Sequence, residues 1–437
     1  MISKTERGRR CSTRMSVVLV TMFAVPLGAS DDEASMTPFV SRLELDAETS
    51  HPLLGNLNYF SQNLPEFIDN VIGPLAPGET AYYYNAKAPM ARLPGISFVP
   101  RYTWQDRELR NIITRPGSSE EPSGSAFPLY YCSIPLDHLP RRVFGDINNL
   151  GFPGGAMMPV TKGGLWITSP GVVAALHFDS SANYLHQLVG TKRVLLINPR
   201  QWRSLYLYSA LHPLARQSQV PFENGPRAIA DAGDFPGALD TVLEEHVLEP
   251  GHSLFIPPFY FHMVHVPSLG QSSIGVNTYL DAPHKEILSN IYAIDVPRSS
   301  VSELLRLMVF LFSSGLSMNL PALALDMLNT RWSHIGRDRF LAGDLSAALG
   351  VGTPLELQSH DTTTLVEPLG KILNSSGGAV GDQLAFVTLF RELRELAPDA
   401  FEMLCADFIE VTTARALGAG SVRALLALLA SGDAPAA

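Results

Sequence analysis

LHFDSSANYLHQLVGTKRVLLINP, residues Leu176 to Pro199, is the stretch of sequence that decides both the expected fold and the expected site. It opens on a His-x-Asp pair and ends in the short apolar run Arg193–Asn198, which stops at a proline. In a strand, residues two apart point to the same face, so His177 and Asp179 can address one point in space. One imidazole and one carboxylate are two ligands of the facial triad that holds Fe(II) and leaves positions open for substrate and oxygen.

The third ligand of such a triad is expected in the segment GHSLFIPPFYFH, residues Gly251 to His262. This segment has the pattern of a turn, a strand, a proline break, an aromatic cluster and then a histidine, so that aromatic rings would wall a dry pocket. His265 is a rival, but it lies three residues further on and in a strand would face the other way. Because a His-x-Asp pair alone is common, the predicted metal site rests on His177, Asp179 and His262 together.

Short strands dominate the middle of the chain, and helices dominate its end. Between Leu165 and Leu280, runs such as Ser253–Ile256 and Ser273–Leu280 are separated by turns, which predicts a mostly β sandwich or barrel. After about His284 the apolar spacing changes to that of helices. Helices are predicted over Val301–Phe312, Leu323–Trp332, Ala385–Leu396 and Ser421–Leu429, with helix-capping residues at Ser300 and Asp399.

These changes of pattern divide the chain into three parts. Residues 1–36 are predicted to be a leader, residues 37–284 the β-rich domain that carries the site, and residues 285–437 an α-helical C-terminal domain. The helical domain is expected either to form a homodimer or to pack back onto the β-rich domain. A length of 437 residues agrees with two to three domains.

Composition and charge disfavour some classes of protein. Apolar residues make up 46% of the chain and charged residues 17%, which is an ordinary globular balance and not that of a disordered chain. The formal net charge is −10 and no dense stripe of Lys and Arg is visible, so nucleic-acid binding is not expected. The three cysteines, Cys11, Cys132 and Cys405, are too far apart for a CxxC zinc site or a disulfide framework.

Two apolar segments bear on targeting and on membranes. Basic residues precede the run Met15–Leu27 and small residues follow it, in the order of a secretory signal peptide; a transit peptide is the alternative, and otherwise the cytoplasm or nucleus is expected. The second run, Leu307–Leu325, is long enough to span a bilayer. Its polar residues and Pro321 favour a buried helix pair broken near Gly315–Pro321, so a membrane partner is not expected.

Taken together, the motifs resemble the JmjC family within the cupin-like 2-oxoglutarate oxygenases, and most of all the asparaginyl hydroxylase that inhibits hypoxia-inducible factor. The resemblance covers residues 125–282 well and residues 38–125 loosely. Its specificity lies in the combination of the ligand pair, a Gly-x-Lys-Arg turn, a PGxxLFIPP segment followed by aromatics and histidine, and a Val-Asn pair. The matching sequence segments are HFDSSANYLHQLVGTKRVLLINP (177–199), RQSQVPFEN (216–224), LEPGHSLFIPPFYFH (248–262) and GVNTYL (275–280).

The resemblance implies a double-stranded β-helix, the jelly-roll or cupin-like core, with flanking helices, and Fe(II), 2-oxoglutarate and O₂ as cofactors. His177, Asp179 and His262 match the iron ligands of the catalytic centre. Lys192 matches the lysine that pairs with the distal carboxylate of 2-oxoglutarate, where each buried charge needs the other. The remaining matches are two amides near the iron-bound end of 2-oxoglutarate and a phenol that donates to its distal carboxylate: Asn183, Asn277 and Tyr130, with Tyr131 as the alternative to Tyr130.

Two positions depart from the family pattern. A threonine that touches the distal carboxylate in similar proteins is Ala174 here, and Thr168 or Ser169 is expected to supply the missing hydrogen bond. The aspartate of the family's PGD turn is His252 here, which we interpret as a structural variation away from the metal.

The predicted function is a 2-oxoglutarate-dependent dioxygenase that hydroxylates a protein side chain and releases succinate and CO₂. The RQSQV text favours a protein substrate. N-methyl demethylation and hydroxylation of a tRNA base are alternatives within the family, and the acidic charge argues against tRNA. A catalytically silent cupin-like binding protein and a sugar-isomerase-type cupin also remain open, although the intact ligands argue against the first and Lys192 argues against both.

Overall fold

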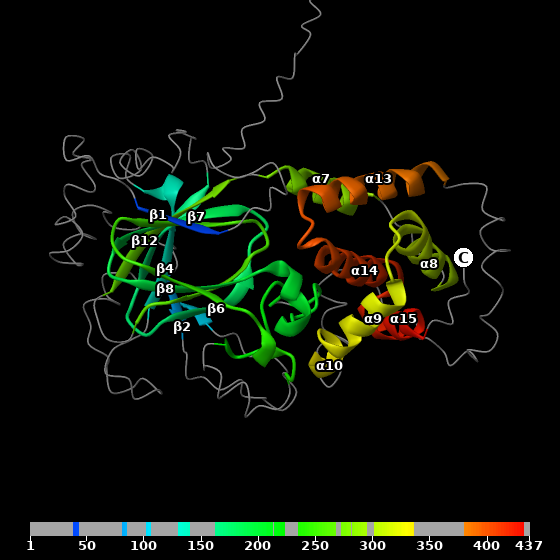
Figure 1. The fold of residues 1–437 in the computed structure, drawn as a ribbon, viewed down its shortest axis with the longest axis horizontal. Coiled ribbons are helices and arrows are strands. Elements are labelled where there is room, and N and C mark those ends of the chain that lie inside the picture. The colour runs from blue at the N-terminus through cyan, green and yellow to red at the C-terminus, as the bar shows by residue number, and fades with distance from the viewer. Residues whose placement is uncertain are drawn as a thin grey trace, which may run out of the picture.

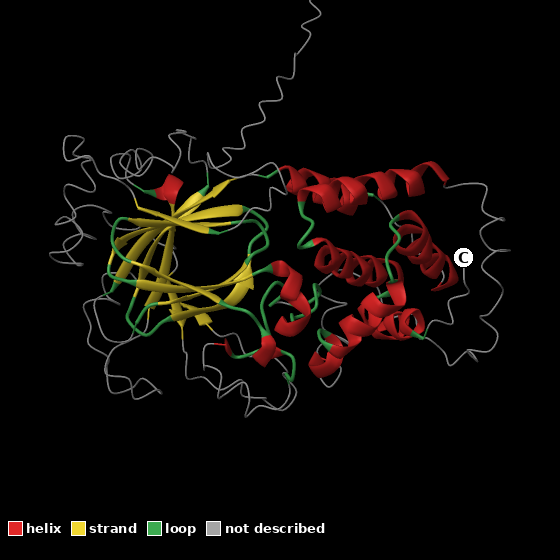
Figure 2. Cartoon of the chain, viewed as in Figure 1, coloured by secondary structure: helices red, strands yellow, loops and turns green. Residues whose placement is uncertain are grey.

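A computed structural model describes the following parts of the chain: residues 38–42, 81–84, 102–105, 130–139, 162–212, 214–222, 235–267, 272–280, 282–294, 301–335 and 380–431. The predicted leader (residues 1–36) and the capping residue Ser300 lie outside these described residues. Figure 1 shows a β-rich part built from the earlier elements and a helical part built from the later ones, and Figure 2 shows the same division by secondary structure.

Two antiparallel sheets form the β-rich part. They face each other, because the Nζ atom of Lys192 in the smaller sheet lies beside Gly275 of the larger one. This arrangement confirms the predicted mostly β, cupin-like fold. The eight-stranded sheet has the order β1 (Phe39–Arg42), β10 (His252–Ile256), β7 (Ala182–Val189), β12 (Ser273–Leu280), β5 (Gly163–Thr168), β4 (Tyr130–Pro135), β2 (Ala81–Tyr84) and β3 (Tyr102–Gln105). The four-stranded sheet has the order β6 (Val173–Phe178), β11 (Phe261–His265), β8 (Lys192–Ile197) and β9 (Glu244–Leu248).

The strands predicted from apolar runs are present as β8, β10 and β12, and β12 has the predicted bounds. The tight turn between β7 and β8 requires a glycine. Gly190 has a φ of +69°, and a Cβ there would lie 2.8 Å from the carbonyl oxygen of Ser272. The turn returns the chain into the smaller sheet, where Lys192 begins β8.

Strand register brings the two histidines together. β11 lies between β6 and β8, and its register pairs His262 with His177 and Phe261 with Phe178. The register shifts just after His262, between His262 and Val264, so that the pairing is regular at the histidines and irregular beyond them. Phe259, just before β11, has a φ of +66°, and its N–H donates to the backbone oxygen of Asp179 at 2.7 Å.

Helices follow the β-rich part, as predicted. They are α7 (Pro283–Ala293), α8 (Val301–Met308), which continues as the π-helical η6 (Val309–Gly315), α9 (Leu320–Asn329), α10 (Trp332–Ile335), α13 (Val380–Leu396), α14 (Phe401–Leu417) and α15 (Val422–Ala430). Each of the four predicted helices overlaps one of these elements. The three short 3-10 turns η2 (Leu136–His138), η5 (Ala238–Asp240) and η9 (Ala419–Ser421), and the longer η3 (Pro199–Leu205), connect elements.

The predicted capping role of Asp399 is wrong. The helix α14 begins at Phe401, and no side chain caps its start. Asp399 instead accepts hydrogen bonds from Asn198 at 3.0 Å and from Arg200 at 2.6 Å. The carboxylate is therefore used to tie the helical part to the residues that follow β8.

One hydrophobic core joins the two parts of the molecule. Leu176 and Phe178 of the sheet belong to the same cluster of buried side chains as Phe312, Phe390 and Phe408 of the helices. The helical part thus packs back onto the β-rich part, which was one of its two expected roles. Association with a second copy through these helices stays a prediction.

The apolar stretch near residue 315 folds as the predicted broken helix pair. Val301–Gly315 and Leu320–Asn329 meet at a bend of 115°. Only the two helices taken together have the length and apolar composition of a membrane span. Within the described ranges, no single helix is long and apolar enough to cross a membrane. Leu311, Phe312 and Leu323 of this pair are buried in the shared core.

Candidate metal centre

Three side chains converge where β6 and β11 lie side by side. His177 comes from β6, Asp179 follows directly after β6, and His262 comes from β11. One ligand atom from each of them can be chosen so that all three lie within 4.8 Å of one another. The imidazole centroids are 4.2 Å apart, and the Nε2 atom of His262 lies 3.8 Å from Oδ2 of Asp179. His262, and not its rival His265, completes this group.

The Nδ1 atom of each histidine is already hydrogen-bonded to a backbone carbonyl oxygen. Nδ1 of His177 lies 2.7 Å from the carbonyl oxygen of Ala175, and Nδ1 of His262 lies 3.1 Å from that of Tyr260. Since a carbonyl only accepts, each Nδ1 carries the proton and each Nε2 is left as a lone-pair donor. This is the tautomer that binds a metal ion through Nε2.

Electrostatics keep the His177 ring neutral. Burial, and next the nearby His262, lower the pKa of His177 to about 4, against an opposing effect of Asp179. A neutral imidazole is the form that can coordinate a cation. The donor set of two imidazoles and one carboxylate therefore fits Fe(II) with positions left open.

Two further residues surround the Asp179 carboxylate. The guanidinium Nη1 of Arg216 lies 3.6 Å from Oδ1, and the hydroxyl of Tyr279 donates to Oδ2 at 3.4 Å. Burial, and next the Asp179 charge, raise the pKa of Tyr279, which keeps the phenol protonated as a donor. Arg216 and Tyr279 were not predicted from the sequence. The position of Tyr279, two residues after Asn277 in a strand, is a signal that could have found it.

Lys192 is a buried cation inside the barrel. Only 3% of the residue is exposed, and burial lowers the pKa of its ammonium to about 8. No acidic side chain in the part of the chain that the structure describes forms an ion pair with it. A buried charge left uncompensated is costly, so this lysine indicates a place for an external anion.

Gly275 leaves space for the Lys192 side chain because it has no Cβ. A Cβ at Gly275 of β12 would lie 2.8 Å from Nζ of Lys192 and 3.2 Å from Oε1 of Gln187. Gln187 was not predicted as a site residue. Its amide nitrogen donates to Val189, Gly190 and Ser273, while its oxygen is buried with no partner among the described residues.

The two predicted amides differ in how much of their bonding capacity is used. Oδ1 of Asn277 accepts from the backbone N–H of Gly164 at 3.0 Å and from the indole of Trp166 at 2.6 Å. Asn183 is buried, and its Oδ1 has no partner within the described residues. Both amides lie on strands of the larger sheet, in register opposite Gly164 and Ile256 respectively.

Of the remaining predicted positions, Tyr130 and Tyr131 lie in β4, Thr168 in β5 and Ala174 in β6. Tyr130 and Tyr131 begin β4, with backbone partners Tyr83 and Thr168, but their side chains lie outside the described residues. Ala174 lies in β6 opposite Val264. The hydroxyl of Thr168, one of the two proposed substitutes, is buried and has no partner among the described residues.

His252 is the first residue of β10, and it bonds back to the turn that precedes the strand. Its Nδ1 accepts the backbone N–H of Glu249 at 3.3 Å, and its own N–H donates to the Glu249 oxygen at 2.9 Å. The imidazole and the backbone of His252 thus both bond Glu249 and close the turn. This agrees with the structural interpretation of His252.

Two facing antiparallel sheets with two histidines and one aspartate inside define a cupin-type metal-site protein. The chain belongs to the cupin-like domain family, whose model matches residues 56–286, more than half of the sequence. Some similar proteins carry JmjC and demethylase names.

The individual similarities are local. The chain is 35% identical over 107 residues to JmjC domain-containing protein D of Dictyostelium discoideum, covering 24% of this chain and 22% of that one. It is 35% identical over 139 residues to lysine-specific demethylase JMJ30 of Arabidopsis thaliana, covering 31% and 30%. It is 34% identical over 113 residues to tRNA wybutosine-synthesizing protein 5 of Mus musculus, covering 26% and 32%. The match therefore spans a third or less of these relatives. Among solved structures, E. coli ycfD aligns with a TM-score of 0.31 and 13% identity over 58% of this chain and 52% of that one.

Proposed function

We propose that the chain is an Fe(II)- and 2-oxoglutarate-dependent oxygenase that hydroxylates a protein side chain and releases succinate and CO₂. The observation that carries this proposal is the combination of the His177–Asp179–His262 group with the buried Lys192, which pairs with no acidic side chain among the described residues. The metal ligands alone would also suit an isomerase-type cupin. Lys192 adds the requirement for a ligand with a negative charge.

Strand geometry gives the distance that such a ligand would bridge. β8 pairs Leu196 with His262, and Lys192 lies four residues away on the same strand and the same face. This separation is about 13 Å between Cα atoms along the strand. The lysine and histidine side chains span part of it, and a short dicarboxylate would span the rest. 2-Oxoglutarate has this shape and carries one carboxylate for each end.

The chain's own groups have distinct tasks in this proposal. His177 and His262 present Nε2 lone pairs, and Asp179 supplies the negative ligand while Tyr279 and Arg216 orient its two oxygens. Lys192 binds the distal carboxylate. Bound iron and 2-oxoglutarate would together supply the activation of dioxygen for insertion of one oxygen atom into a C–H bond.

The interior of the barrel excludes water from this chemistry. Side chains of β7, β8, β9 and β10, together with Tyr260 just before β11, form a buried apolar cluster that consists of Leu185, Val194, Leu196, Leu248, Leu254, Ile256 and Tyr260. A dry, low-dielectric pocket strengthens the ion pair between Lys192 and a carboxylate and limits side reactions.

A protein substrate is favoured over a tRNA by two features of the sequence. Residues 216–224 resemble the text of protein hydroxylases, and Arg216 lies at the metal site with an exposed side chain. The net charge of −10 opposes binding to a phosphate backbone. Oxygen insertion at an N-methyl group would instead release formaldehyde, so demethylation is an outcome that the experiment must separate.

The first test is turnover without a substrate. We expect purified protein with Fe(II), ascorbate and 2-oxoglutarate to produce succinate slowly, and the variants His177→Ala and Asp179→Ala to produce none. His265→Ala is the matched control, since His265 lies outside the group and should retain turnover. Absence of succinate, together with no 2-oxoglutarate binding by calorimetry, would support a silent or isomerase-type cupin.

The second test identifies the substrate. Proteins that co-purify with an inactive His262→Ala variant are incubated with wild-type enzyme and analysed by mass spectrometry. A gain of one oxygen on a side chain supports the proposal. Loss of a methyl group with formaldehyde production would replace protein hydroxylation by demethylation.

A further inference from the structure

A loop between β8 and β9 extends the smaller sheet past β6. This covering loop consists of Tyr206–Gln219, of which Pro213 lies outside the described residues. The Ser218 N–H donates to the oxygen of Leu176 at 3.0 Å, and the Phe178 N–H donates to the oxygen of Arg216 at 3.2 Å. His177 forms an isolated antiparallel bridge with Gln217. The loop therefore fixes the outer edge of the strand that carries the first metal ligand.

The covering loop is itself a two-armed structure. Two backbone hydrogen bonds join its arms. The Tyr208 N–H donates to the oxygen of Gln217 at 3.0 Å, and the Gln219 N–H donates to the oxygen of Tyr206 at 3.0 Å. The arm that touches β6 is thus placed by the arm that begins at Tyr206. Whatever holds the first arm also sets the edge of the metal site.

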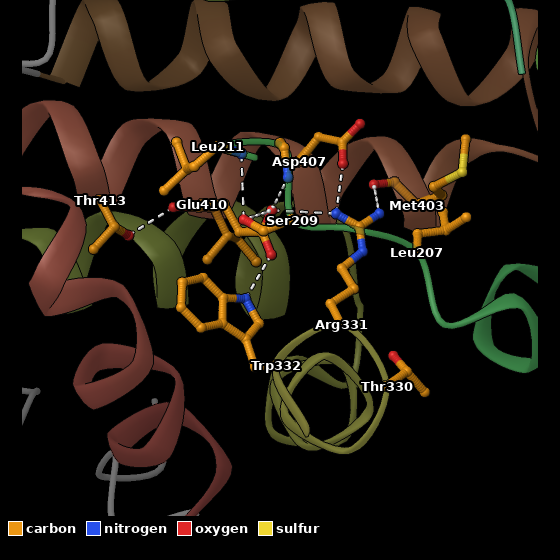
Figure 3. A network of polar contacts seen from close by, with 12 residues as sticks. Leu207, Ser209, Leu211, Thr330, Arg331, Trp332, Met403, Asp407, Glu410 and Thr413 are labelled. Carbon is orange, nitrogen blue, oxygen red and sulfur yellow. Dashed lines mark hydrogen bonds and ion pairs between the residues drawn. The ribbon is translucent and has the colours of Figure 1, made fainter. Parts of the chain in front are cut away.

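A buried carboxylate of the helical part holds the end of this first arm. Glu410 of α14 is 0% exposed, and its Oε2 accepts the hydroxyl of Ser209 at 3.0 Å and the backbone N–H of Ala210 at 2.6 Å. Figure 3 shows Glu410 and Ser209 pointing toward one another from the two parts of the molecule.

The same carboxylate is fixed from the other side. Trp332 donates its indole N–H to Oε1 of Glu410 at 2.7 Å, and Nη1 of Arg331 lies 3.3 Å from Oε2 (Figure 3). Arg331 also bonds Asp407 at 2.5 Å, and its backbone oxygen accepts the amide of Gln219 at 3.1 Å. Both arms of the covering loop therefore end on one network in the helical part.

From this series of contacts we propose that Glu410 is a positioning residue for the metal centre, which acts through the covering loop on β6. The inference rests on the proposed function for the identity of the metal site. It predicts that the helical part is required to keep His177 and Asp179 in place, and not only to cover the barrel.

The substitution Glu410→Gln tests this with little change of shape. One amide oxygen cannot replace two carboxylate oxygens that face donors on both sides, so the amide N–H₂ must oppose either Trp332 or the Ser209–Ala210 arm. The matched control is Thr413→Val, on the same helix. The buried Thr413 hydroxyl bonds only the oxygen of Ile409 in its own helix, at 2.6 Å, and does not reach the loop (Figure 3).

Two measurements test the effect of the substitution on the covering loop, on β6 and on the metal centre. Hydrogen exchange of the full-length, metal-free chain, read by mass spectrometry, reports on peptides from the covering loop and from β6. Titration with Co(II), read by visible absorption, reports on the ligand geometry. We expect Glu410→Gln to speed exchange in both peptides about tenfold and to weaken Co(II) binding about tenfold. Thr413→Val should change neither, whatever it does to overall stability.

The outcomes separate the two proposals. If wild-type protein binds no Co(II), the proposed function fails. If wild-type protein binds Co(II) but Glu410→Gln matches Thr413→Val in loop exchange and Co(II) affinity, the positioning role is overturned. Should Glu410→Gln fail to fold, Ser209→Ala decides the question, because it removes the hydroxyl that donates to Glu410 and accepts the Leu211 N–H, and leaves Arg331, Trp332 and Glu410 intact. A positioning role predicts faster loop exchange and weaker Co(II) binding in this variant as well.

Discussion

Lys192 in the barrel and Arg331 in the helical part are both buried cations, but they are compensated very differently. Arg331, which is 1% exposed, lies 2.5 Å from Asp407 and 3.3 Å from Glu410. Lys192, which is 3% exposed, pairs with no acidic side chain within the described residues. Burial lowers the pKa of Lys192 to about 8; burial also acts to lower that of Arg331, but the two carboxylates outweigh it and raise the pKa. A paired buried cation indicates internal structure, and an unpaired one indicates a ligand site.

The largest expected effect is on the paired cation. Arg331→Ala would leave the buried Glu410 and the partly exposed Asp407 without their cation, and we expect it to lower the free energy of unfolding by about 3–5 kcal/mol. Urea denaturation measures this loss. The control is Arg200→Ala, which removes the exposed ion pair with Asp399 and should cost about 1 kcal/mol or less. Equal losses in the two variants would contradict the distinction between buried and exposed pairs.

Removing the charge of Lys192 should weaken ligand binding without lowering the stability of the ligand-free chain. Lys192→Met keeps the length of the side chain and removes the charge, so the unfolding free energy of the ligand-free chain should not fall. Binding of 2-oxoglutarate should weaken by about 2–5 kcal/mol, because one partner of a buried ion pair is lost. Calorimetry with Mn(II) and 2-oxoglutarate measures this. Wild-type affinity in the variant would show that the anion binds elsewhere.

The room around the lysine can be changed without touching its charge. Gly275→Ala would place a methyl group 2.8 Å from Nζ of Lys192, and we expect about 1–3 kcal/mol of destabilisation together with weaker 2-oxoglutarate binding. Gly420→Ala is the matched control, because no atom lies within 4 Å of a Cβ at that position. Thermal unfolding of both variants, with and without 2-oxoglutarate, compares them. Equal effects would mean that the interior around Lys192 is not closely packed.

The buried Lys192 also predicts a pH dependence of the free energy of unfolding. Because the pKa of Lys192 falls from 10.5 to about 8 on folding, the unfolded chain binds more protons between these values. Stability of the ligand-free chain should therefore rise with pH across this window, by at most about 1.4 kcal/mol per pH unit relative to Lys192→Met. Urea titrations of the two proteins from pH 7 to about 10 measure the difference. Bound 2-oxoglutarate should reduce the slope, since it stabilises the charged lysine.

The sequence predicted the fold and the convergence of His177, Asp179 and His262 because their signals are local. β12 alternates in side-chain type, β8 stops at Pro199, and His177 and Asp179 lie two apart on the strand pattern. Such periodicity follows directly from strand geometry. The third ligand required only that His262 follow a strand and a proline break.

The helical network could not be predicted in this way. α14 buries residues around its whole circumference, so it has no single apolar stripe to mark it as a helix that faces a core. Arg331 and Glu410 are distant in sequence, and only packing brings them together. Asp399 had the spacing of a capping residue but bonds Arg200 instead, because tertiary contacts override a local preference.

Phe259 combines two demands that oppose each other. Its left-handed backbone is one that glycine adopts freely, and a bulky residue there costs about 1–3 kcal/mol of conformational strain. Its buried ring meets Phe178 and His284, with centroids 6.1 Å and 4.7 Å away. A glycine would relax the main chain but remove the aromatic wall beside Asp179. Truncating a buried aromatic ring costs about 3–5 kcal/mol, which exceeds this strain, so selection for heat resistance and selection for turnover would both retain the phenylalanine.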